Sequence, residues 1–191
     1  MGKRGKKFIW NGIEFDSPDE TFFAMWLQEL LEAEFILAWE RCTKSFEVTE
    51  GVKNAFKEGS KEKTQTILQN LEYTPDFEVY WSIKSDSVFY GVLGNGRKIV
   101  EPFISDHKMS VVEVKPNFDK NNMTRLFRQV QKFLYKTRKL YVNQVIIEKL
   151  FGETFTPREY LLTKTGKERK ITKWKVKSLE DFLNGNRISK R

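Results

Sequence analysis

The 191-residue chain contains a single cysteine, Cys42, and a single histidine, His107. One thiol cannot form a disulfide within the chain, and these two residues cannot supply the ligands of a zinc site. The sequence also lacks the run of about 18 apolar residues that a membrane span needs. Its basic start is not followed by an apolar run, as it would be in a secretion signal. We therefore expect a cytoplasmic protein without a membrane segment, whose chemistry depends on oxygen ligands.

Aromatic residues make up 14% of the chain and hydrophobic residues 39%, which is enough to form one buried core. We expect a single domain over residues 1–191, with its core at about 13–150 and a basic C-terminal extension at about 151–191. Lysine and arginine number 34 against 26 acidic residues, a formal net charge of +8. This excess favours an anionic polymer such as nucleic acid as the partner, although a merely basic domain would also show it.

The beginning of the chain predicts a hairpin and then a helix. An Asn-Gly pair at 11–12 separates two short apolar runs, which is typical of a tight β-hairpin. Ser17 is followed by a proline and by Glu20, the capping-box pattern that begins a helix. Apolar residues then recur every three or four positions, so we expect this helix to end near Phe35.

The rest of the chain predicts a mixed sheet and a second long helix. Short apolar or alternating runs predict strands at 36–48, 71–83, 88–92, 99–104, 111–114 and 142–147. Residues 50–63 are polar and contain two glycines, which predicts a loop. Periodicity predicts a helix at 122–139, and the tail predicts a basic hairpin at 160–176 and a short helix at 179–183 that Gly185 ends. Together these elements predict an α/β fold, with a mixed central β-sheet flanked by α-helices.

Charged residues interrupt two of the expected strands. Asp76 follows a proline in one, and Glu113 and Lys115 lie in the other. Because side chains alternate along a strand, Glu113 and Lys115 must share one face. Such groups are costly inside an apolar sheet unless a divalent cation lies between the two carboxylates, and Mg²⁺ prefers that kind of oxygen site. An ordinary charge pair on a solvated sheet edge is the alternative.

The run Pro75-Asp76 followed by Glu113-Val114-Lys115 resembles the motif of the PD-(D/E)xK nuclease superfamily. Residues 15–20, before the first helix, resemble its phage endonuclease I and transposon-end endonuclease branches. The resemblance covers roughly residues 13–135 and implies a restriction-endonuclease-like fold. The interval between the two halves of the motif is longer than is usual in the family, which implies an added β-hairpin from about 80 to 104.

The resemblance also implies the roles of individual residues. Asp76, Glu113 and the carbonyl of Val114 would hold Mg²⁺, with Mn²⁺ as a substitute, and Lys115 would be the catalytic lysine. Glu20 would assist this metal site, although its place in a capping box is a complete explanation without catalysis.

The implied activity is that of a metal-dependent DNA endonuclease of phage or mobile-element origin, which would act in the cytoplasm of the host cell if a phage encodes it. A bound Mg²⁺ activates water for attack on a phosphodiester, and Lys115 would position or deprotonate that water and stabilise the phosphate oxygens. The substrate would be duplex or branched DNA, and a homodimer would cut both strands most easily. The alternatives are a nucleic-acid-binding module without cleavage, and an exonuclease or RNA-directed nuclease with the same centre.

Two basic segments are candidates for contacts to DNA. The expected helix at 122–139 contains no acidic residue, and its apolar stripe is formed by Met123, Leu126, Phe127, Val130 and Leu134. Gln131 and Tyr135 resemble the Gln-x-x-x-Tyr motif of exonuclease relatives. The candidate DNA contacts on this helix are Arg125, Arg128, Gln131, Lys132, Tyr135 and Lys136. The tail adds Lys170, Lys173 and Lys175 next to Trp174. A solvated basic face is the alternative for both segments.

Overall fold

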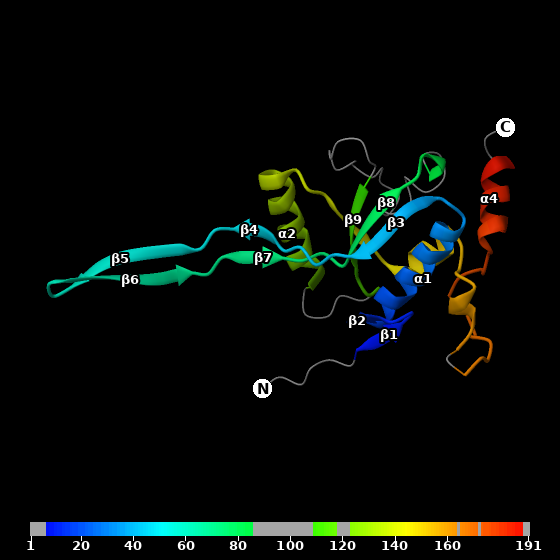
Figure 1. The fold of residues 1–191 in the computed structure, drawn as a ribbon, viewed down its shortest axis with the longest axis horizontal. Coiled ribbons are helices and arrows are strands. Elements are labelled where there is room, and N and C mark those ends of the chain that lie inside the picture. Colours follow the sequence, from blue (N-terminus) through cyan, green and yellow to red (C-terminus); the bar gives the residue numbers. More distant parts are fainter. Residues whose placement is uncertain (1–6, 86–108, 118–122, 164, 172, 189–191) are drawn as a thin grey trace.

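The computed structural model describes residues 7–85, 109–117, 123–163, 165–171 and 173–188. Within these residues four strands form a mixed sheet in the order β10-β9-β8-β3, where the strands are β3 (Ile36–Arg41), β8 (Phe77–Trp81), β9 (Met109–Val114) and β10 (Val142–Val145). Strand β9 is parallel to β10 and antiparallel to β8, and β8 is antiparallel to β3. The mixed α/β architecture expected from the sequence is therefore confirmed (Figure 1).

Two long helices pack on the sheet through separate clusters of apolar side chains. Helix α1 (Pro18–Glu32) belongs to a cluster that includes Val112 of β9. Helix α2 (Met123–Arg138) belongs to a second cluster that includes Val111. Because neighbouring residues of a strand point to opposite faces, the two helices cover opposite faces of β9. Glu113 shares the face of Val111 and therefore lies on the α2 side.

The N-terminal hairpin and the helix cap form as the sequence predicts. Strands β1 (Phe8–Trp10) and β2 (Ile13–Phe15) pair around the Asn-Gly turn, whose residues have left-handed φ angles of 48° and 78°. The Ser17 hydroxyl accepts a hydrogen bond of 3.2 Å from the backbone N–H of Glu20. Turn and cap depend on residues only a few positions apart, so the local sequence determines both.

The prediction of one strand at 36–48 is wrong. The strand β3 ends at Arg41, and a second strand, β4 (Phe46–Thr49), leaves the central sheet and pairs with β7 (Leu71–Tyr73). The two strands differ in their partners, and the sequence pattern does not show this difference.

The prediction of a loop at 50–63 is also wrong. These residues belong to β5 (Val52–Glu58) and β6 (Lys61–Leu68), an antiparallel ribbon that continues β4 and β7 into a long projection (Figure 1). We call residues 46–73 the arm. Every residue of β5 and β6 is exposed, so the ribbon has no buried face and lacks the apolar alternation that predicts a strand.

The C-terminal part differs from the expected hairpin and short helix. The chain turns at Gly166 as expected, with an antiparallel bridge between Leu162 and Glu168 and a backbone hydrogen bond from Thr163 to Lys167, but the described residues of 160–176 do not extend this bridge into longer strands. A 3₁₀ turn, η2 (Glu159–Leu161), precedes this bridge. Helix α4 (Leu179–Ile188) continues through Gly185, which the sequence analysis expected to end it. A glycine in an exposed helix costs only about 1 kcal/mol relative to alanine, which is too little to end a helix.

Two further differences concern the ends of expected strands. Residues after Val145 form α3 (Ile147–Glu153), a short helix that the sequence analysis did not predict. The expected strands at 88–92 and 99–104, and with them most of the added hairpin, lie outside the described residues. The first part of that hairpin belongs to β8 and to the 3₁₀ turn η1 (Ile83–Ser85).

Candidate active site

Two hydrogen bonds to the backbone of β9 hold Asp76 beside that strand. Its backbone N–H donates to the carbonyl of Val112 over 3.0 Å, and its carboxylate Oδ2 accepts the N–H of Val114 over 2.7 Å. Asp76 stands immediately before β8 and Lys115 immediately after β9, so neither is inside a strand as the sequence predicted. Because β8 and β9 are antiparallel, the beginning of β8 lies beside the end of β9. Asp76 and the Glu113–Lys115 segment therefore meet.

Glu113 and Lys115 share one face, as the alternation of side chains predicts, and form an ion pair. Their side chains are only 8% and 16% exposed. The Lys115 ammonium also lies 5.7 Å from the centroid of the Phe127 ring of α2. Strand β9 lies between β8 and β10 in the sheet, so this pair is not the charge pair on a solvated edge that the sequence left open.

Tyr73, at the end of β7, completes this cluster and was missed by the sequence analysis. Its ring packs against Phe127 with centroids 6.2 Å apart. Burial, and next the negative charge of Glu113, raise the pKa of Tyr73 above its ordinary value. Within the described residues, neither the Tyr73 hydroxyl nor the Oε2 atom of Glu113 has a hydrogen-bond partner of acceptable geometry. Hydrogen bonding to Glu113 nevertheless contributes to the raised pKa of Tyr73, so the two groups lie close together. A buried carboxylate oxygen with so poor a donor is costly, and a cation would compensate for it.

The two carboxylates of this cluster repel each other. The pKa of Asp76 is raised to about 8, chiefly by burial and next by the negative charge of Glu113. The Val114 N–H and Lys115 oppose this shift, and Glu20 adds a smaller repulsion. Two acids that lie close together with one lysine as counter-charge fit a divalent cation.

The donor set is small. No group of three or more His, Cys, Asp or Glu side chains gathers at metal-binding distance in the part of the chain that the structure describes. The site offers two carboxylates, to which the carbonyl of Val114 would add a third oxygen. Such a set suits Mg²⁺, which keeps several waters, and does not suit zinc.

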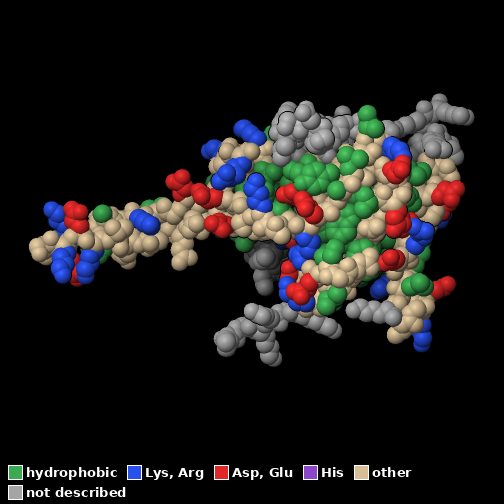
Figure 2. All heavy atoms as spheres, in the orientation of Figure 1, with side chains coloured by type: hydrophobic (Ala, Val, Ile, Leu, Met, Phe, Trp, Pro, Cys, Tyr) green, Lys and Arg blue, Asp and Glu red, His purple; other side chains and the backbone are tan. Residues whose placement is uncertain are grey.

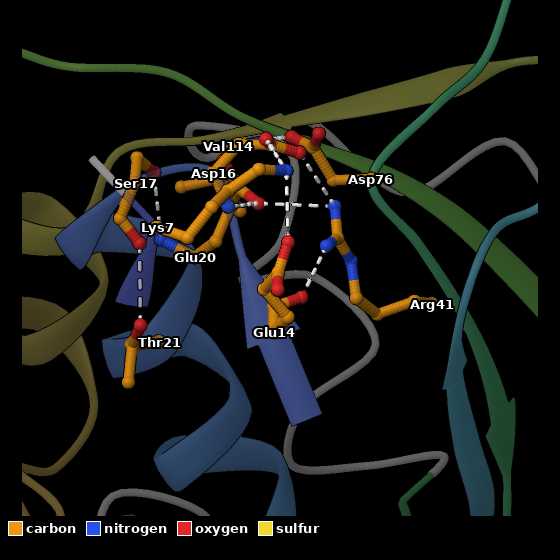
Figure 3. A network of polar contacts seen from close by, with 9 residues as sticks. All are labelled: Lys7, Glu14, Asp16, Ser17, Glu20, Thr21, Arg41, Asp76 and Val114. Carbon is orange, nitrogen blue, oxygen red and sulfur yellow. Dashed lines mark hydrogen bonds and ion pairs between the residues drawn. The ribbon is translucent and has the colours of Figure 1, made fainter. Parts of the chain in front are cut away.

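Glu20 fills the structural role that its sequence position suggested. Its Oε2 atom accepts the backbone N–H of Asp16 over 3.1 Å and an Nη2 donor of Arg41 over 3.2 Å (Figure 3). The side chain is 8% exposed, so these bonds satisfy a buried charge. The negative charge of Glu20 contributes to the raised pKa of Asp76, while its Oε2 atom is occupied by the Asp16 N–H and by Arg41.

Arg41 is the second site residue that sequence reasoning missed. It ends β3 opposite Phe77, the residue after Asp76. Its guanidinium donates to the carbonyl of Glu14, pairs with Asp16 over 3.2 Å and with Glu20, and lies 5.4 Å from the centroid of the Phe15 ring (Figure 3). Nothing in the local sequence distinguishes this arginine from one on a solvated strand.

We expect Arg41→Ala to lower the free energy of unfolding by about 2 kcal/mol or more, because it leaves the buried charge of Glu20 without a partner. Adding Glu20→Gln should recover part of that loss, and a double-mutant cycle by urea denaturation measures the coupling. A coupling free energy near zero would mean that the pair contributes nothing to stability.

The raised pKa of Asp76 predicts a dependence of stability on pH in the presence of EDTA. The unfolded chain releases this proton near pH 4, and the folded protein holds it until about pH 8. The stabilising contribution of the bound proton is therefore complete below pH 4 and is lost as the pH rises to 8. Asp76→Asn should flatten the fall in stability between pH 5 and 8, as measured by urea denaturation. An equal slope in both proteins would contradict this assignment.

The basic residues predicted to contact DNA from α2 are exposed: Arg125, Arg128, Lys132 and Lys136. The stripe prediction is wrong for Leu126, which is 52% exposed, although Phe127, Val130 and Leu134 are buried. Gln131 donates its side-chain amide to the carbonyl of Val142, so it ties α2 to β10. Tyr135 is 41% exposed and stands edge-on to Tyr141.

In the tail, the predicted contacts Lys170, Lys173 and Lys175 are exposed. Lys173 pairs with Glu148 of α3. Trp174 is partly buried, and its indole N–H donates to the hydroxyl of Thr156 over 3.0 Å, so it fastens the tail to the body. This contact occupies the indole N–H of Trp174, which the sequence analysis named beside the lysines of the tail.

A cavity of about 380 Å³ lies beside the tail. Its wall includes Asp19, Glu148, Lys170 and Lys173, and also Pro116, the residue after Lys115, but not Asp76, Glu113 or Lys115 themselves. Burial, and then the charge of Glu148, raise the pKa of Asp19.

Comparison with known proteins does not identify the chain: no protein-family model, no curated protein and no solved structure matches it. No helix within the described ranges is long and apolar enough to cross a membrane. Any proposal of function therefore depends on the geometry and chemistry of the residues themselves.

Proposed function

We propose that this protein is a metal-dependent endonuclease that hydrolyses phosphodiester bonds in DNA. The observation that carries the proposal is the cluster of Asp76, Glu113 and Lys115, in which Glu113 is buried with one oxygen unpaired. A protein in which a buried ion pair is replaced by well-packed apolar residues is often at least as stable as the original. A strongly perturbed acid pair with a lysine is therefore a candidate for function rather than for stability.

Asp76, Glu113 and the carbonyl of Val114 would hold the Mg²⁺ ion, with Mn²⁺ as a substitute. When bound, such an ion supplies a more acidic water and stabilises charge on the phosphate. The two backbone hydrogen bonds of Asp76 keep its carboxylate in place before any ligand binds.

Lys115 would act on the substrate. Its ammonium carries three donors, and its ion pair with Glu113 places it at the carboxylate cluster. There it would orient the attacking water and donate to a phosphate oxygen as negative charge develops in the transition state. The exposed basic residues of α2 and of the tail would bind the DNA backbone on either side.

The proposal is tested by incubating the protein with supercoiled plasmid, linear duplex, four-way junction and RNA. We expect cleavage of DNA with Mg²⁺ or Mn²⁺, none with EDTA, and binding with little cleavage in Ca²⁺. Undiminished cleavage in EDTA would refute the metal mechanism. Binding without cleavage would leave a nucleic-acid-binding module, and cleavage of RNA alone would change the substrate. The same gels distinguish nicking of one strand from cutting of both, and sedimentation shows whether the protein is a monomer or a dimer.

A further inference from the structure

The arm is not explained by the catalytic centre. Its β5–β6 ribbon extends away from the body as two strands without a covering element, and Lys and Glu side chains gather at its tip (Figures 1 and 2). Every residue of the two strands is exposed. An isolated two-stranded hairpin is only marginally stable in water, because it buries little apolar surface. The length of the ribbon therefore indicates a partner that covers it.

The composition of the ribbon indicates what kind of partner it has. Residues 52–68 contain four lysines and two glutamates. Three of their exposed large apolar side chains, Val52, Ile67 and Leu68, lie at the base of the ribbon, and Phe56 is the one nearer the tip. Stable protein interfaces have an apolar centre that is poor in lysine and glutamate. A second copy of this chain, or another protein, would bury these charges without compensation. A polyanion would neutralise the excess of lysine.

The register of the ribbon assigns its side chains to two faces. Asn54 lies opposite Gln65 and Phe56 opposite Lys63, and cross-strand partners share a face. These side-chain types can read the edges of base pairs: amides bond to adenine, lysine to guanine, and an apolar ring contacts the thymine methyl group. Lys63 would exchange its ion pair with Glu58, on the same face, for such a contact. Apart from its lysines, the opposite face carries mainly the small residues Ala55, Thr64 and Thr66.

We propose that the β5–β6 ribbon lies in the major groove of duplex DNA, with the face of Asn54, Phe56 and Gln65 on the base edges. Strands in a ribbon are about 4.8 Å apart, and a major groove about 12 Å wide admits two of them. Lysines at the rim and tip contact the phosphates. This proposal rests on the proposed function for its choice of DNA as the partner.

The arm is also joined directly to the centre. Strand β7 ends at Tyr73, whose hydroxyl lies in the buried cluster, and Asp76 follows three residues later. On the other side β4 connects through a short segment to Arg41. A ribbon in the groove therefore fixes the position of the duplex relative to Asp76 and selects which phosphodiester reaches it.

The test compares two triple variants of the full-length protein. Asn54→Ala, Phe56→Ala and Gln65→Ala change the proposed reading face, and the matched control Ala55→Ser, Thr64→Ala and Thr66→Ala changes the opposite face without removing a lysine. Affinity for duplex DNA is measured by fluorescence anisotropy in Ca²⁺. Loss of several base contacts should weaken binding by roughly tenfold or more, and the control should weaken it only about twofold. Methylation of guanine N7 in the major groove should weaken binding of the wild type.

Equal effects of the two triple variants, or insensitivity of the wild type to N7 methylation, would overturn the ribbon proposal. The proposal would also be overturned if the reading-face variant converted a dimer to a monomer while the affinity of each protomer for DNA was unchanged. The ribbon would then be covered by a second copy of the chain rather than by DNA. The binding assays need no cleavage, so failure of the ribbon and failure of the nuclease are distinguishable. A wild type that never cuts but still loses affinity in the reading-face variant would refute only the nuclease.

Discussion

Asp76→Asn and Glu113→Gln should each lower the rate of DNA cleavage by about 10² to 10⁴-fold while the protein stays folded. Each change keeps the shape of the side chain and removes one of the two negative charges that would hold the cation. The oxygen of an asparagine at position 76 can still accept the Val114 N–H, so the backbone geometry should persist. Affinity for DNA should hold or rise, because a carboxylate that faces phosphate repels it when no cation lies between them.

Single-turnover nicking at saturating protein measures this loss, and Glu78→Gln is the matched control. Glu78 is a partly exposed carboxylate on β8 whose oxygens bond to Tyr80 and Cys42 rather than to the cluster. The control should cut at the wild-type rate. In EDTA at pH 8, Asp76→Asn should also melt at a higher temperature than the wild type, which would exclude unfolding as the cause of its inactivity. Wild-type rates in both site variants would end the case for a nuclease.

Lys115→Ala should lower the cleavage rate by about 10² to 10³-fold while the protein still binds Mg²⁺. The variant removes the ammonium that would hold the water and the phosphate oxygen, and it leaves both carboxylates in place. Without the ion pair to Glu113 the metal-free protein should be less stable, and saturating Mg²⁺ should restore much of that stability.

The dependence of the cleavage rate on Mg²⁺ concentration distinguishes two roles for this lysine. A low maximal rate at an unchanged Mg²⁺ requirement supports a role in catalysis. If the variant instead reached the wild-type rate at higher Mg²⁺, Lys115 would serve only to position Glu113. Lys84→Ala is the control, because Lys84 forms an exposed ion pair with Glu34 and should affect neither quantity.

The elements that depend on neighbouring residues could be predicted from the sequence by itself. The Asn-Gly turn needs two left-handed residues, the cap of α1 needs a hydroxyl at Ser17, and both are set within a few positions. The alternation along β9 likewise determined that Glu113 and Lys115 share a face, because a strand's side chains have a period of two. The burial of α2 followed its periodicity at Phe127, Val130 and Leu134 but not at Leu126, which is 52% exposed.

Only the tertiary structure decided how the candidate site is assembled. Asp76 meets Val114 across 38 positions through a hydrogen bond from the Val114 N–H to the Asp76 carboxylate, and Tyr73 joins the cluster at the end of β7, which pairs with β4. Arg41 ends β3, which pairs with β8, and reaches Glu20 rather than the cluster itself. The ribbon of the arm was also invisible in the sequence, because an element with no buried face leaves no apolar period. Local patterns record a residue's contact with solvent or core, whereas strand partners and ion pairs depend on which distant segments the sheet places side by side.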